Sequence, residues 1–349
     1  MSTSEQVNYA RKRIQPELGE GLIFDNKDLT SLFLKQPTDL TEEEASLIRQ
    51  CYLTFGLDKF HSFAKHQKIL PFVAHTLKYL ELDTNFWLSE HKVFIDRNSK
   101  IKEFLEELFS ASHEFSCFSL TLTENFGALI ASNSCIGDFC SGDVDIYADL
   151  EELDNITRLM TFFNFFSKEQ PKDIGEYTGQ SLQFFCSSFL DEGFWINIIW
   201  LPVTRAFLIQ DKYTKRLNEH RQMAVTAQGS NIRFLEPTSL LYFCALHISA
   251  GHYFTLNPGL RLYVDLDRIL RKCDINWFDL LEWEKEDNAG NRISMAIYLS
   301  HRLMGSPIPD HIHSRIFNKK RNKKLFKYLF NAKTNSIQSN GSIIRRLYV

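Results

Sequence analysis

Cysteine is scarce in this sequence, and the seven cysteines include no Cys-x-x-Cys pair. An odd number of scattered cysteines argues against a disulfide framework, and the missing pairs argue against a zinc ribbon or knuckle. Cys135 and Cys140 are the closest two cysteines. Because no pair of histidines stands near them in the sequence, we expect both to be packing residues.

Long apolar runs are also missing. None approaches the roughly 20 residues that a membrane-spanning helix needs, and residues 1–13 are polar and charged, unlike a signal peptide. We therefore expect a cytoplasmic protein that makes no contact with a membrane. A chain of 349 residues that is 44% hydrophobic can bury a large core, and we expect two or three packed units.

Acidic residues are absent after Asp310, whereas residues 311–349 carry ten lysines and arginines. The rest of the chain holds 30 basic and 43 acidic residues. Such a basic tail can dock on nucleic acid or lie against the acidic surface of its own protein. Leu325, Tyr328 and Leu329 recur at helical spacing, so we favour an amphipathic helix folded onto the body, with nucleic acid as the alternative.

Apolar spacing predicts helices on both sides of a mixed central segment. Residues 29–82 have helical periodicity, and Thr41-Glu42-Glu43-Glu44 is a typical helix start, with a hydroxyl and three acids for the free amides. His61, His66 and His75 lie in this part, where we expect solvated or packing histidines. A further amphipathic helix is predicted at residues 94–113.

Strands and helices alternate between residues 116 and 201, and helices follow. The strands are predicted at 116–122, around the acids 143–149, and at 181–189 and 194–201; later helices are predicted at 237–249, 259–272, 277–285 and 291–304. The fold class is therefore α+β, with a small mixed sheet, helices on one side of it, and helical units at both ends. The predicted divisions are 1–94, 95–210, 211–310 and the basic tail 311–349.

Acidic side chains alternate with apolar or small ones from Gly142 to Asp149, in the rhythm of a strand. Because side chains on a strand change face at every residue, Asp143 and Asp145 must point the same way. Neighbouring carboxylates repel each other unless a cation or a shared proton lies between them, and Mg²⁺ is a frequent partner. The alternative is that these acids form only the wet face of a strand.

A glycine shortly before the acid strand adds a second signal. Phe126-Gly127-Ala128-Leu129 is predicted to begin a helix after a short apolar strand. A glycine turn that opens a helix can offer free backbone amides to phosphate. Gly127 and Ala128 are therefore candidate nucleotide contacts, together with Gly142, which directly precedes Asp143.

These motifs resemble the DNA-polymerase-beta-like nucleotidyltransferases, and within that superfamily the uncharacterised nucleotidyltransferase family. The resemblance rests on Gly127-Ala128 followed by Asp143-Val144-Asp145-Ile146, and on Trp195-Ile196-Asn197-Ile198-Ile199-Trp200 at the place of the next strand. The helical region 235–266 also fits, with His247, His252 and the segment from Arg261 to Asp265. The similarity extends from about residue 95 to Pro309.

The resemblance implies transfer of a nucleoside monophosphate with release of pyrophosphate, assisted by Mg²⁺ or Mn²⁺. It assigns catalysis and metal binding to Asp143 and Asp145. The third metal ligand of the superfamily falls near Asn197, which offers a neutral oxygen and no charge. Asn197 and Arg261 are further candidates for contact with the nucleotide, which we expect to be ATP.

Several family residues are replaced in this chain. Phe126 and Phe139 stand where the family has a lysine and an arginine, and Ile199 stands where it often has a histidine. Asp138, Asp149, Asp191 and Glu192 are candidates for a substitute third acid. His247, His252, Arg261, Asp265 and Asp267 can line the far side of a cleft, but Arg261 and Asp265 are also spaced for a structural ion pair. His247 and His252 are five residues apart, a poor spacing for a shared metal on one helix face, so we favour a structural role for them.

Two functions from different classes therefore remain. The first is an active metal-dependent nucleotidyltransferase acting on a small molecule, a peptide or a protein. The second is a degenerate member that keeps the fold, binds a ligand or partner, and catalyses nothing. Kinase-like phosphotransfer is disfavoured, because the sequence contains neither a Walker loop nor a His-Arg-Asp catalytic loop.

Overall fold

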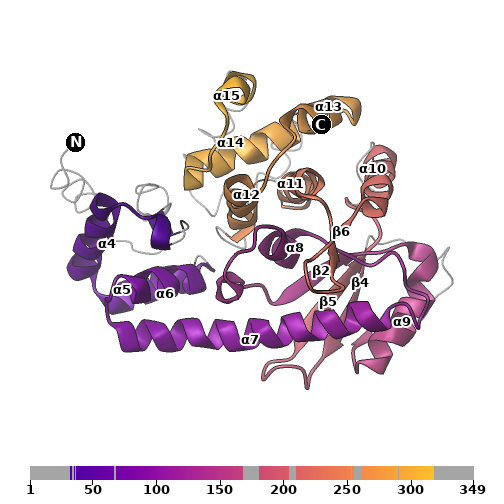
Figure 1. Cartoon of the computed structure of the whole chain (residues 1–349), viewed down its shortest axis with the longest axis horizontal. Helices are drawn as coiled ribbons and strands as arrows, with labels where there is room; N and C mark the ends of the chain where they lie inside the picture. Colours follow the sequence, from indigo (N-terminus) through magenta and orange to yellow (C-terminus); the bar gives the residue numbers. More distant parts are fainter. Residues whose placement is uncertain are drawn as a thin grey trace, which may run out of the picture.

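The computed structural model describes residues 32–33, 35, 37–66, 68–167, 181–203, 210–252, 254, 261–289 and 291–317. The predicted helix through Leu325, Tyr328 and Leu329, and most of the predicted basic tail, lie outside these residues. Figure 1 shows helices at the N-terminal end, a sheet at the opposite end, and further helices above the sheet.

Three short helices open the described chain: α4 (Glu42–Phe55), α5 (Leu57–His66) and α6 (Leu70–Tyr79). The predicted start of α4 is confirmed. The Thr41 hydroxyl accepts a hydrogen bond from the Glu44 amide at 3.2 Å, and the Glu44 carboxylate accepts one from the Thr41 amide at 3.0 Å. This reciprocal cap satisfies two amides that the first helical turn would leave unbonded.

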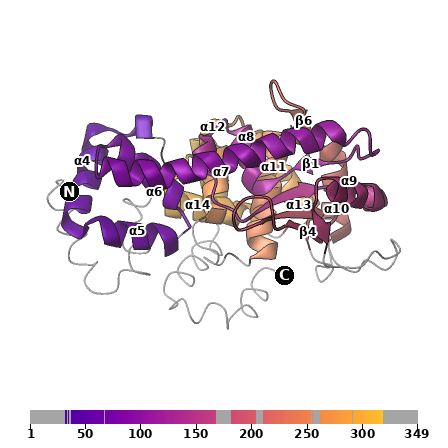
Figure 2. The ribbon, with the colours of Figure 1, turned by 90° about the horizontal axis from the view of Figure 1, so that it is seen from below.

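The longest helix, α7 (Thr84–Ala111), runs along one side of the molecule from the N-terminal helices to the sheet (Figures 1 and 2). At 28 residues it is about 42 Å long, at 1.5 Å per residue. The predicted division at residues 94 and 95 falls inside this helix. The N-terminal unit and the sheet are therefore joined by one continuous rod.

A seven-stranded mixed sheet forms in the order β3-β4-β5-β2-β1-β7-β6. Its strands are β1 (Thr121–Leu122), β2 (Asp143–Tyr147), β3 (Phe166–Ser167), β4 (Ser181–Cys186), β5 (Phe194–Ile199), β6 (Val225–Thr226) and β7 (Arg233–Phe234). Strands β2 and β5 are parallel, whereas β1 pairs with β2 and β4 pairs with β5 in antiparallel fashion. The acid strand β2 therefore lies at the centre of the sheet.

The two faces of β2 pack against different parts of the chain. Val144 and Ile146 belong to a buried cluster with residues of α7 and of α9 (Leu153–Phe162). On the opposite face Tyr147 packs against Phe243 of α11 (Pro237–Leu246), with ring centroids 5.8 Å apart. Alternation along the strand thus sends apolar side chains to one core and the two aspartates toward the C-terminal helices. The predicted α+β class is confirmed, but helices cover both faces of the sheet and not the one side that was expected.

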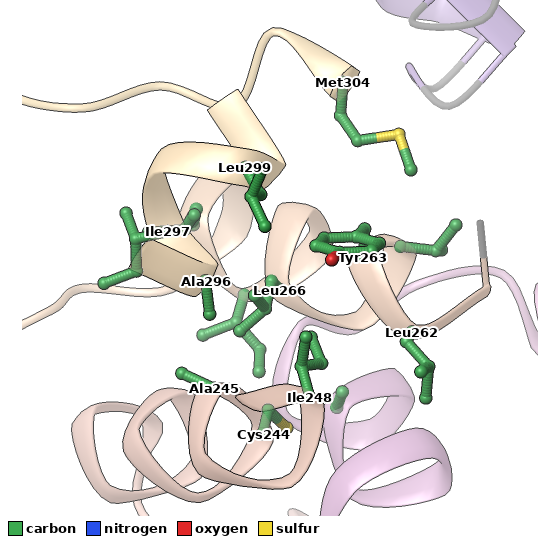
Figure 3. Packing of buried hydrophobic residues seen from close by; sticks show 14 of the residues in the cluster. Cys244, Ala245, Ile248, Leu262, Tyr263, Leu266, Ala296, Ile297, Leu299 and Met304 are labelled. Carbon is green, nitrogen blue, oxygen red and sulfur yellow. The ribbon is translucent and has the colours of Figure 1, made fainter. Parts of the chain in front are cut away.

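Four of the C-terminal helices occur close to their predicted positions: α11, α12 (Arg261–Lys272), α13 (Trp277–Glu286) and α14 (Arg292–Met304). Figure 3 shows the packing of α11, α12 and α14, with Cys244 and Ala245 of α11 facing side chains of α12 and α14. Helix α8 (Glu124–Ala131) contacts both α11 and α12. A final short helix, α15 (Asp310–Phe317), packs on α14.

Three elements of the segment 210–234 were not predicted. Helix α10 (Gln210–Gln222) lies between β5 and β6 in the sequence. Strands β6 and β7 extend the sheet beyond β1. Two-residue strands are too short to produce an alternating pattern, so their pairing depends on the neighbouring strand alone. The predicted division near residue 210 therefore falls before two strands that complete the sheet.

Candidate active site

The strand register brings Asp143, Asp145 and Asn197 together on one face of the sheet. Strands β2 and β5 are parallel neighbours in which Asp145 lies opposite Asn197. The side-chain nitrogen Asn197 Nδ2 donates to Asp143 Oδ2 at 2.9 Å and to Asp145 Oδ1 at 2.8 Å. The two carboxylates thus converge on a single atom, as the alternating sequence predicted.

Asp145 is the more deeply buried of the two acids. Its side chain and that of Asn197 are buried, whereas Asp143 is half-buried. Burial, together with the negative charges of Glu124 and Asp143, raises the pKa of Asp145 to about 7, against the hydrogen bond from Asn197 and the charge of His247. A group of acids whose pKa rises for these reasons is stabilised by a cation.

The amide of Asn197 is only half satisfied. Its nitrogen serves both aspartates, but its oxygen Oδ1 is buried without a hydrogen-bond partner. The orientation of an asparagine amide follows from its hydrogen bonds, and turning it over exchanges its nitrogen and oxygen. With the oxygen turned toward the aspartates, all three side chains would present oxygen atoms to one point. This donor set fits Mg²⁺ or Mn²⁺.

A third acid, Glu124, lies beside this pair and was missed in the sequence. It is the first residue of α8, is buried, and has a backbone φ of +43°. The charge of Glu124 raises the pKa of Asp145 more than the charge of Asp143 does. The neighbouring Asn125 Nδ2 donates to Asp145 Oδ2 at 3.1 Å. The only sequence signal was an acid at the start of the helix that precedes the acid strand.

His247 reaches this site from the C-terminal helices. It begins the π-helical turn η5 (His247–Gly251), and its Nδ1 lies 3.1 Å from Glu124 Oε1. His252 Nε2 lies 2.9 Å from His247 Nε2. His247 therefore contacts an acid beside the aspartate pair, and the lining of a cleft by these two histidines stays a prediction.

The other polar residues of α12 have structural partners. Asp265 lies 3.5 Å from Arg268 Nη1, and Asp267 bonds Arg271 at 2.7 Å and Ser306 at 2.6 Å. The side chain of Arg261 lies outside the described part of the chain, so its predicted contact with nucleotide stays a prediction.

The glycine signal has a different meaning from the one expected. Helix α8 begins at Glu124, so the prediction that Gly127 opens it is wrong. The Gly127 amide already donates to Thr123 O at 3.3 Å, and a Cβ at this position would meet the Leu122 backbone at 3.3 Å. Gly127 therefore allows close packing of α8 on β1.

Ala128 is fully buried, which corrects its expected contact with nucleotide. Gly142 is exposed beside open space.

The two phenylalanines that replace the family's cations are core residues. Phe126 and Phe139 are buried, with ring centroids 4.9 Å apart in an edge-to-face contact. A nearby cation comes instead from α7. Arg97 Nη2 donates to Ser141 O at 2.7 Å. Burial lowers the pKa of Arg97, and the charges of Cys140, Glu192 and Asp143 oppose this change.

None of the four expected substitute acids contacts the aspartate pair through a described hydrogen bond or ion pair. Asp149 pairs with Arg221, and Asp138 bonds His75 at 3.2 Å. Asp191 and Glu192 are exposed in the turn before β5. The additional negative charge beside the aspartate pair therefore comes from Glu124 and not from these four acids.

Two surface pockets lie away from the acid pair. One, of about 500 Å³, is lined by residues that include Lys102, Glu106 and Ser230, and the other, of about 270 Å³, by residues that include Asp149, Arg221 and Arg233. Neither is lined by Asp143 or Asp145. We place the candidate site at the aspartates because donor atoms converge there, which pocket size does not measure.

Comparison with protein families finds one match. Residues 140–305 match the model of the uncharacterised nucleotidyltransferase family. The match begins just before the acid strand, includes Asn197 and His247, and ends after α14. It confirms over these residues the resemblance that the motifs indicated. No curated protein and no solved structure matches the chain.

Among the described helices, none is both long enough and apolar enough to cross a lipid bilayer.

Proposed function

We propose that this protein is a metal-dependent nucleotidyltransferase that moves a nucleoside monophosphate from a nucleoside triphosphate, ATP in our expectation, to a small-molecule, peptide or protein acceptor. The observation that carries the proposal is the convergence of Asp143 Oδ2 and Asp145 Oδ1 on one atom, Asn197 Nδ2. The match of residues 140–305 to a nucleotidyltransferase family supports it.

The position of each side chain in the site suggests its role. Asp143 is half-buried and borders solvent, so it can face both an ion and a phosphate. Asp145 is buried behind it and is held by Asn125 and Asn197. Glu124 supplies a third negative charge, whereas Asn197 lends an oxygen without charge. A bound Mg²⁺ or Mn²⁺ would neutralise phosphate charge and activate the attacking oxygen of the acceptor.

Phosphate binding must rely on groups other than the family's lysine and arginine. The exposed backbone at Gly142 directly precedes Asp143 and has open space before it. Arg97 lies against the same segment through its bond to Ser141 O. A guanidinium beside the acid pair can attract a polyphosphate tail. Arg261 remains a candidate for the same task.

The experiment is calorimetric titration of ATP in the presence and absence of Mg²⁺. We expect binding that requires Mg²⁺ and that disappears in the double variant Asp143→Asn/Asp145→Asn. Asp154→Asn is the matched control, because Asp154 is an exposed acid on α9. Binding that is equal in the double variant and in the wild type would contradict the proposal.

A second candidate function is a ligand-binding module that has lost catalysis. Asn197 in place of an acid, and the buried pair Phe126 and Phe139 in place of cations, favour it. The two functions differ in pyrophosphate release. Mg²⁺-dependent binding of ATP without pyrophosphate release across a panel of acceptors would favour the module.

A further inference from the structure

A second group of metal-ligand side chains lies outside the candidate active site. It consists of His75 from α6, His91 from α7, and Cys135 and Asp138 from the turn η2 (Ile136–Asp138) and the residue before it. Each offers one nitrogen, sulfur or oxygen atom, and these four atoms all lie within 4.8 Å of one another. Three separate elements thus bring four donor atoms close together.

Two distances within the group, both to Asp138, are close to those between the ligands of one metal ion. His75 Nδ1 lies 3.2 Å and His91 Nε2 lies 3.4 Å from the same oxygen, Asp138 Oδ1. Ligands at zinc bond lengths of about 2.0 to 2.3 Å in a tetrahedron are about 3.3 to 3.8 Å apart. Only a small movement of these atoms is needed to surround an ion.

His91 Nε2 provides an independent observation. The His91 side chain is 1% exposed, and its Nε2 is buried without a hydrogen-bond partner, although it faces Asp138. A buried polar nitrogen without a hydrogen bond costs free energy of folding unless a hydrogen-bond partner or a metal ion binds it. Gly137 keeps the turn close to this nitrogen, since a Cβ there would come within 2.5 Å of His91 Nε2.

We propose that His75, His91, Cys135 and Asp138 bind a zinc ion or a similar transition metal, separate from the Mg²⁺ or Mn²⁺ of the candidate active site. Two imidazoles, one thiolate and one carboxylate are borderline-soft ligands, which suit zinc better than magnesium. With four protein ligands the site is closed, which is typical of a structural metal and not of a catalytic one.

Surrounding contacts already hold the ligands in place. Arg268 Nη2 donates to Asp138 O at 2.9 Å. Asn98 Nδ2 donates to Ile136 O at 2.8 Å and to Phe139 O at 2.9 Å. Such outer contacts fix the orientation of metal ligands. Because the same segment continues into Asp143, a metal here would connect the N-terminal helices rigidly to the acid strand.

One contact opposes the metal. Lys78 Nζ lies 3.3 Å from His91 Nδ1, and a nitrogen that accepts from an ammonium leaves the proton of neutral imidazole on Nε2. Metal binding at Nε2 moves that proton to Nδ1, so the half-buried Lys78 side chain must turn away. Lys78→Met should therefore tighten metal binding, because it removes both the competing bond and a positive charge.

The experiment uses Co²⁺ as a spectroscopic substitute for zinc in the full chain. We expect one equivalent of Co²⁺ to bind with a thiolate charge-transfer absorption, and Zn²⁺ to displace it. The conservative variant Cys135→Ser should abolish that absorption and weaken Zn²⁺ binding at least tenfold. Cys140→Ser is the matched control, since Cys140 lies in the same segment but outside the group.

Two further results separate this site from the candidate active site. The Asp143→Asn/Asp145→Asn variant should keep the thiolate absorption, because it leaves all four ligands intact. Circular dichroism of each variant establishes that it is folded. Absence of stoichiometric Co²⁺ binding, binding without a thiolate absorption, or an unchanged absorption in Cys135→Ser would each overturn the proposal.

Discussion

Asn197 lies opposite Asp145 in the parallel pair of β2 and β5 and donates to its carboxylate at 2.8 Å. The same nitrogen also donates to Asp143. In the absence of metal this amide performs the task of a cation, because it holds together two carboxylates that would otherwise repel each other. The two carboxylates therefore stay together through their shared bonds to one amide nitrogen.

Asn197→Asp should have opposite effects with and without metal. The new carboxylate adds a charge for the ion, so we expect Mg²⁺ or Mn²⁺ to bind about tenfold more tightly, roughly 1.4 kcal/mol. Without metal the variant loses two hydrogen bonds and gains a repelling charge, so unfolding should need about 2 kcal/mol less free energy. Metal titration and urea unfolding in EDTA measure the two effects. Weaker metal binding would show that the third ligand lies elsewhere.

Glu124→Gln tests the acid that the sequence did not reveal. The Glu124 carboxylate is the charge that most raises the pKa of Asp145. Its removal should weaken Mn²⁺ binding by several-fold to tenfold, because two carboxylates then balance the charge of the ion. Glu151→Gln is the control, since Glu151 is an exposed acid just beyond β2. Equal Mn²⁺ affinity in wild type and Glu124→Gln would remove Glu124 from the site.

Gly127→Ala and Gly142→Ala form a matched pair for stability. A Cβ at Gly127 would meet backbone atoms of Leu122 in β1 at 3.3 Å, whereas no atom would be met within 4 Å at Gly142. The first variant should lose about 1 to 2 kcal/mol from overpacking, and the second should change by less than about 0.5 kcal/mol. Urea unfolding midpoints measure both. A neutral Gly127→Ala would mean that α8 can shift on β1.

His220 should make stability depend on pH. Burial lowers its pKa below the ordinary 6.5, the charge of Glu236 opposes this, and Arg216 adds to it. The charges of Glu219 and Asp279 also oppose the shift. Above pH 6.5 histidine is neutral in both states and the full stability is present. As pH falls below 6.5 the unfolded chain binds the proton first, so stability is lost.

The comparison is between wild type and His220→Gln at pH 7.5 and 5.5. The wild type should lose up to about 1.4 kcal/mol more than the variant between these values. Ser239, whose hydroxyl lies 2.6 Å from His220 Nδ1, keeps its bond to Glu236 in both proteins. Equal losses in the two proteins would mean that His220 takes up its proton as easily in the folded state as in the unfolded one.

Local patterns predicted the parts of the fold that depend on near neighbours. The alternation from Gly142 to Asp149 placed Asp143 and Asp145 on one face, because strand geometry allows nothing else. The apolar pattern of residues 237–304 predicted α11 to α14, because helices of a folded chain bury their apolar side chains. The signal at Thr41 predicted the start of α4 through its cap.

Other expectations failed where packing decided the role of a residue. Gly127 resembled a phosphate-binding turn but serves close contact with β1. His75 was expected to be a solvated or packing histidine and Cys135 a packing residue, and these expectations stay open beside the proposed metal site with His91 and Asp138. Asp138 was considered as a third acid for the site and instead bonds His75.

The sequence by itself determined which residues form the acid strand, which face the two aspartates share, and where the principal helices lie, since these depend on periodicity and covalent geometry. Only the tertiary structure decided that Glu124 and His247 join the aspartates and that α6 and α7 bring two histidines to Cys135 and Asp138. Those meetings join side chains on separate elements, and they are fixed by how α7, α8 and α11 pack around the sheet.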